Sequence, residues 1–144
     1  MIHICMIKII LGNSNTENRA TALLKKTLNT YTMENSKFKS CIDACLACAA
    51  ECNSCATNCL HEKDIKMMVN CIQLDRQCVV ICLASAQLMS IGGEHATHLC
   101  AECEEICEAC AKECSNHLND HCKKCAEACL KCANECRKML TVAA

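Results

Sequence analysis

The residues of this chain that can do chemistry are its cysteines. Twenty of the 144 residues are cysteine, and nineteen of these fall in four runs with spacings of three or four residues, apart from one gap of seven between Cys71 and Cys78. The spacing within the first run is 4, 3, 4, 3 and 4 residues, which is the seam of an amphipathic helix where Leu or Ile normally lies. The runs are Cys41, Cys45, Cys48, Cys52, Cys55 and Cys59; Cys71, Cys78 and Cys82; Cys100, Cys103, Cys107, Cys110 and Cys114; and Cys122, Cys125, Cys129, Cys132 and Cys136.

Sites made only of sulfur select Cu(I), zinc or iron–sulfur clusters. Thiols at i and i+4 of one helix have Cβ atoms ~5–6 Å apart. With metal–sulfur bonds of roughly 2.3 Å, a linear S–Cu–S unit spans ~4.6 Å, so such pairs suit two-coordinate Cu(I). Bridging by each thiolate then gives on the order of one copper per cysteine. A zinc or mixed-metal thiolate buffer and a CxxC redox protein remain as alternatives.

The same spacing argues against a disulfide-stapled protein. A disulfide needs Cβ atoms roughly 3.8 Å apart, which i,i+4 neighbours on an intact helix do not reach. Residues 1–11 are apolar, are too short to span a bilayer and lack a basic leading region and a cleavage site. We therefore expect a cytoplasmic protein with reduced thiols and no membrane partner.

Charge and motifs narrow the function further. The chain has 15 basic and 16 acidic residues, so no excess of positive charge favours nucleic acid. No nucleophile–base pair or open metal motif points to catalysis. We expect a binding protein and not an enzyme.

The runs must be carried by helices, because proline is absent and there are only 3 glycines. We expect an all-α protein with helices at 36–61, 63–91, 94–117 and 120–140, broken at Gly92 and Gly93. Short connections predict an antiparallel up-down four-helix bundle with a cysteine-lined core. The predicted domains are this bundle at 34–144 and an N-terminal extension at 1–33, in which a strand at 2–11 and a turn at Gly12–Asn15 precede a helix at 17–31. Cys5 in this extension is expected to be an incidental apolar residue.

The helical cysteine runs, together with CIQLDRQC at 71–78 and NDHCKKCAEACLKCANEC at 119–136, resemble the cytosolic branch of the bacterial copper-storage proteins. The resemblance covers residues 33–140. It implies Cu(I) ions stored on thiolates inside a four-helix bundle, a homotetramer, and exchange with copper chaperones or small thiols. The N-terminal extension has no counterpart in that family.

Three histidines and one aspartate complete the candidate site. An antiparallel bundle places His61, His117 and His121 at one end, where the resemblance suggests a mouth that passes Cu(I) inward and outward. Histidines are also common in polar turns, so a structural role stays open. Asp75 falls on the cysteine face of its helix, and a buried carboxylate needs a partner. Arg76 or a lysine is one candidate partner and a copper at the edge of the site is another; we expect Asp75 to support the ligands and not to bind copper itself.

Overall fold

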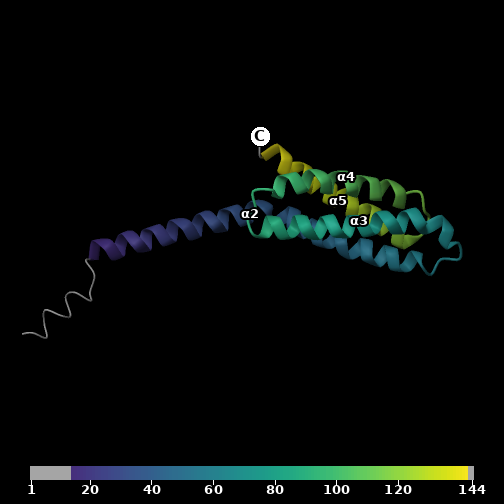
Figure 1. The fold of residues 1–144 in the computed structure, drawn as a ribbon, viewed down its shortest axis with the longest axis horizontal. Coiled ribbons are helices and arrows are strands. Elements are labelled where there is room, and N and C mark those ends of the chain that lie inside the picture. The colour runs from purple at the N-terminus through teal and green to yellow at the C-terminus, as the bar shows by residue number, and fades with distance from the viewer. Residues whose placement is uncertain (1–13, 143–144) are drawn as a thin grey trace, which may run out of the picture. The chain divides into compact units, whose positions relative to one another are not determined.

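The computed structural model describes residues 14–142, in which every regular element is an α-helix. The helices are α2 (Ser14–Cys59), α3 (Ile65–Ser90), α4 (Ala96–Cys114) and α5 (Asp120–Val142) (Figure 1). The predicted all-α class is thus confirmed for the described part of the chain. The strand predicted at 2–11 and Cys5 lie outside the described residues.

One boundary prediction was wrong. A turn was expected to include Ser14 and Asn15, and separate helices were expected at 17–31 and from residue 36. The structure instead places Ser14, Asn15 and both of these predicted helices in the single helix α2. The physical reason is that 14–59 contains neither proline nor glycine, so no residue in it interrupts the backbone hydrogen bonds of a helix.

The chain divides into two compact units, residues 1–36 and 37–144. All nineteen cysteines of the runs belong to the second unit. Within it α3 packs along α4, and α4 packs along α5 (Figure 1).

The break between α3 and α4 is confirmed at the predicted glycines. Gly92 has a φ of +66°, which lies in the left-handed region that side-chain-bearing residues avoid. The amides of Gly92 and Gly93 donate to the carbonyls of Met89 and Leu88 at 3.2 and 2.9 Å, which closes the end of α3. This tight turn returns the chain so that the cysteine faces of α3 and α4 meet.

The core of the second unit is sulfur and alanine. All nineteen cysteines have no exposed surface, and Ala44, Ala49, Ala111 and Ala133 fill the positions beside them. Large aliphatic side chains lie outside this core: Val80 is 69 % exposed and Leu130 50 %. This arrangement inverts the usual one, because apolar burial favours placing the aliphatic residues inside.

Among the described residues, α3 is the one helix long and apolar enough to cross a membrane by length and composition. The core helix of a protein outside the membrane meets the same criterion, so the observation carries little weight. Its cysteine face packs against sulfur atoms of the other helices, and its outward face carries exposed Met67, Val80 and Leu83.

Candidate metal centre

The nineteen thiols of the second unit form a connected array of sulfur atoms. All of them are free thiols. Their Sγ–Sγ contacts range from 3.4 Å between Cys78 and Cys107 to 4.0 Å between Cys55 and Cys59. The array has members from all four described helices, so the tertiary packing and not one helix creates the site.

Groups of four cysteines lie close enough to share one metal ion. In each group all sulfur atoms lie within 4.8 Å of one another. Examples are Cys45, Cys103, Cys132 and Cys136; Cys48, Cys52, Cys78 and Cys129; Cys48, Cys78, Cys82 and Cys107; Cys52, Cys110, Cys125 and Cys129; and Cys55, Cys59, Cys71 and Cys122. Several cysteines occur in two groups, so their thiolates are placed to bridge neighbouring ions.

Five i,i+4 pairs of cysteines have sulfur atoms closer together than a linear Cu(I) site requires. Cys48–Cys52, Cys78–Cys82 and Cys125–Cys129 each have an Sγ–Sγ distance of 3.9 Å. With bonds of roughly 2.3 Å, a 3.9 Å separation corresponds to an S–Cu–S angle of about 116°. That angle is near the 120° of trigonal coordination, so these pairs in the unloaded core fit three sulfurs per ion better than the linear arrangement expected from one helix.

Asp75 lies inside the array, fully buried. The thiols of Cys110 and Cys125 each donate to its Oδ1 at 3.2 Å, and Cys114 donates to the same oxygen at 3.7 Å. Cys71 donates to Oδ2 at 3.8 Å. Burial, and then the charge of Cys125, raise the pKa of Asp75 to about 8.

These contacts identify the partners that the carboxylate was expected to need. They are thiols and not Arg76, whose side chain is exposed. Asp75 connects the cysteines near Cys71 and Cys114 to those near Cys110 and Cys125, so it occupies a position in the array that a sulfur would otherwise fill.

His121 is the histidine that the structure brings to the sulfur atoms. Its Nδ1 lies 3.4 Å from the Sγ of Cys122, 3.5 Å from that of Cys55 and 3.9 Å from that of Cys59. Its Nε2 lies 3.0 Å from the Oε1 of Glu62. This hydrogen bond lowers the pKa of the Glu62 carboxyl below its usual range.

Such an arrangement fixes the histidine tautomer. A carboxylate that accepts the proton of one ring nitrogen leaves the lone pair of the other nitrogen for a metal. Here the free nitrogen is Nδ1, which points at three thiols. Glu62 was not predicted from the sequence, because its partner lies 59 residues away and no local spacing connects them.

The other two predicted histidines are not placed in contact with the array. His61 is exposed in the turn after α2. The Nε2 of His117 lies 3.3 Å from Glu113, four residues earlier on α4. Both lie near the end of the array that holds His121. Within residues 14–142, neither side chain makes a hydrogen bond to a sulfur atom.

Burial raises the pKa of the thiols, whereas hydrogen bonds between thiols raise the pKa of some, such as Cys82, and lower that of others. At the His121 end, burial raises the pKa of Cys122 to about 12 and raises that of Cys59 as well. In the middle of the array, hydrogen bonds from Cys107 and Cys129 lower the pKa of Cys48. A thiolate stabilised by donor thiols is the form that binds a soft cation, so Cu(I) entry displaces protons from the array.

Comparison with known proteins identifies the array. The sequence model of the copper storage protein family (Csp) matches residues 34–141. The chain belongs to the copper storage protein family. The match covers every cysteine of the array, and the resemblance read from the cysteine runs is confirmed.

Solved structures of copper storage proteins share the fold. The Cu(I)-bound copper storage protein BsCsp3 of Bacillus subtilis is 42 % identical, with a TM-score of 0.70 over 72 % of this chain and 98 % of that one. A cytosolic copper storage protein from Streptomyces lividans, described with five coppers, is 32 % identical, with a TM-score of 0.73 over 76 % of this chain and 97 % of that one. An uncharacterised cysteine-rich protein, YhjQ of Bacillus subtilis, is 44 % identical over 83 residues, which are 58 % of this chain and 77 % of its own.

Proposed function

We propose that this protein stores Cu(I) on the cysteine array and does not act as an enzyme. The observation that carries the proposal is the sharing of buried, reduced thiols between neighbouring four-sulfur groups. Shared thiolates bridge ions, and bridging lets one core hold many ions. Each Cu⁺ offsets the charge of about one thiolate, which limits the cost of burying the loaded core.

The proposed ligands are the nineteen cysteines of the four runs, with His121 at one end. Among the three histidines predicted from the sequence, His121 has the geometry of a ligand. His61 and His117 are proposed as residues of the same mouth, where Cu(I) would pass between the array and a copper chaperone or a small thiol. The nearness of Nδ1 to Cys55, Cys59 and Cys122 supports this route.

The proposed architecture is an antiparallel up-down four-helix bundle at 34–144, with residues 1–33 as an extension outside it. The order of sulfur contacts supports opposite directions for α2 and α5. Cys41 contacts Cys136, whereas Cys52 contacts Cys125. On α3 and α4, Cys71 contacts Cys114 and Cys82 contacts Cys103, again in reverse order.

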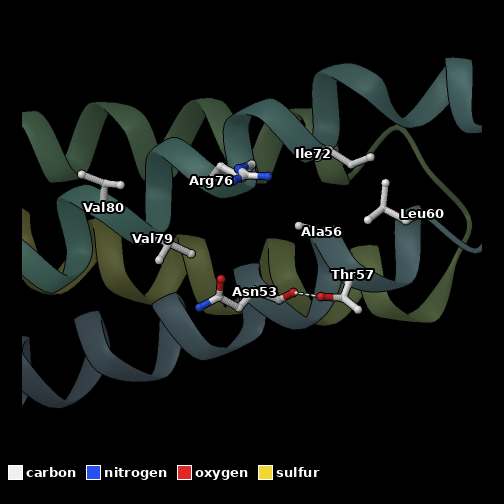
Figure 2. A pocket seen from close by; sticks show the side chains of 8 residues that line it. All are labelled: Asn53, Ala56, Thr57, Leu60, Ile72, Arg76, Val79 and Val80. Carbon is white, nitrogen blue, oxygen red and sulfur yellow. Dashed lines mark hydrogen bonds between the residues drawn. The ribbon is translucent and has the colours of Figure 1, made fainter.

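We further propose a cytoplasmic homo-oligomer, a tetramer by resemblance. The outward face of α3 supports an interface, because its Ile72, Val79 and Val80 line a groove with Leu60, which directly follows α2 (Figure 2). Light scattering after size exclusion tests this: Val80→Lys, at a 69 % exposed position, should release monomers if the face is buried between copies. The cytoplasmic location is supported by the Streptomyces relative, which is described as cytosolic.

The test of storage is an anaerobic titration of the reduced protein with Cu(I) against a competing chelator. Tight binding should end near one copper per array cysteine, a stoichiometry that only bridging thiolates can hold. An endpoint of a few ions would refute storage on a shared array.

The geometry also fits zinc, which keeps one alternative open. A tetrahedral site with bonds of roughly 2.3 Å has sulfurs ~3.8 Å apart, within the range seen here. Four thiolates per zinc would give far fewer ions than bridged Cu(I), so the same titration run with zinc distinguishes a zinc buffer from a copper store.

A further inference from the structure

The cysteine face of α3 continues beyond its last cysteine. Its inward positions are Cys71, Asp75, Cys78, Cys82, Ser85 and Met89, separated by 4, 3, 4, 3 and 4 residues. This is the same spacing as in the first cysteine run, and all six residues are fully buried. Met89 therefore occupies a position of the sulfur array where the other helices carry a thiol.

The thioether sulfur of Met89 contacts a thiol of the array. Its Sδ lies 3.8 Å from the Sγ of Cys100 on α4. The Sγ of Cys41 on α2 lies 3.6 Å from the Sγ of Cys136 on α5. Hydrogen bonds from Cys100 and Cys136 lower the pKa of Cys41, so these contacts connect one sulfur from each of the four described helices.

The separation suits a copper ion between the two sulfurs. With bonds of roughly 2.3 Å, a distance of 3.8 Å corresponds to an S–Cu–S angle of about 111°. A third sulfur completes trigonal coordination at such an angle. A thioether is a soft ligand that Cu(I) accepts and needs no deprotonation.

A buried methionine is often only a filler of apolar space. Two other buried methionines serve as a comparison: Met68 is 4 % exposed and Met139 7 %. For neither of them do the recorded contacts of the described residues include a sulfur atom. Of these three buried methionines, Met89 alone has its sulfur directed at a thiol of the array.

We infer that Met89 Sδ and Cys100 Sγ hold a Cu(I) ion, with the thiolate of Cys41 or Cys136 as the third ligand. The inference rests on the proposed storage function and adds a mixed thioether–thiolate site to it. The site closes the array at the α3–α4 turn, at the far end from His121. Because a neutral thioether attracts Cu⁺ less strongly than a thiolate does, this ion is held more weakly than those in the middle of the array.

Selenium in place of the methionine sulfur reports directly on this bond. The protein is produced with selenomethionine, reduced, loaded anaerobically with Cu(I) to the titration endpoint, and measured by X-ray absorption at the selenium edge. We expect a selenium–copper contribution from about one of the 7 methionines. Met89→Leu should abolish it, and Met139→Leu, a substitution of similar size and burial at the same end of the helices, should leave it unchanged.

Each outcome is decisive. Full copper loading without a selenium–copper contribution overturns the Met89 site and leaves storage intact. A contribution that persists in Met89→Leu assigns the bond to another methionine and also overturns it. Uptake of only a few coppers by the unsubstituted protein refutes storage on the array, and the Met89 site fails with it. The measurement on the unsubstituted protein stands even if a variant folds poorly.

Discussion

Asp75→Asn is expected to make the copper-free protein more stable, and increasingly so as the pH rises. An unfolded chain ionises an aspartate near pH 3.8, whereas the folded protein keeps Asp75 protonated until about pH 8. Between these values the unfolded state binds fewer protons than the folded state, so raising the pH favours unfolding. Asparagine keeps the oxygen that Cys110 and Cys125 contact and does not ionise.

The magnitude follows from the pKa. At ~1.4 kcal/mol per pKa unit, the three pH units from 5 to 8 correspond to at most ~4 kcal/mol, and to ~2 kcal/mol if the site relaxes around the charge. For a domain of about 100 residues, 1 kcal/mol shifts the melting temperature by ~4–8 °C. The melting temperature of Asp75→Asn relative to the unsubstituted protein should therefore rise by ~10 °C or more from pH 5 to pH 8.

The assay is thermal unfolding of the reduced, metal-free protein, followed by circular dichroism at each pH. Asp43→Asn serves as the control, because Asp43 is 61 % exposed and pairs with Lys39; its effect should be small and should not grow over this range. A difference between Asp75→Asn and the unsubstituted protein that stays constant from pH 5 to pH 8 would refute the argument that Asp75 is a neutral acid in the unloaded core.

Three further predictions concern copper. Glu62→Gln should slow Cu(I) transfer to a chelator or change its pH dependence, because Glu62 orients the ring of His121. Glu113→Gln, beside His117, is the control and should have little effect. Stopped-flow measurements compare the transfer rates of the two variants, and equal rates would exclude the orienting role. Ser85→Cys should raise the Cu(I) endpoint by about one ion, since it adds a thiol at a buried array position, and an unchanged endpoint in the titration would show that this position lies outside the array. Loading should release protons and tighten with rising pH, because the thiols must deprotonate; proton release measured in weak buffer checks this, and pH-independent affinity would contradict it.

Local spacing was sufficient to predict much of the site. The alternation of three and four residues from Cys41 to Cys59 defines one face of a helix, and any packing that buries this face brings its thiols together. The same reasoning correctly placed Asp75 inside. It failed where nothing local marks the outcome: the residues around Ser36 permit either a helix end or continuation, and α2 continues through them.

The sequence alone determined that the described chain is helical, that its cysteines lie on the inward faces of the helices, and that these thiols suit soft metal ions. These properties depend on contacts within one or two helical turns. Only the tertiary structure decided which sulfurs of different helices meet in shared groups of four, and that Glu62 holds His121 against Cys55 and Cys122. Such contacts join residues as many as 95 positions apart, and they depend on how whole helices pack, which no local pattern specifies.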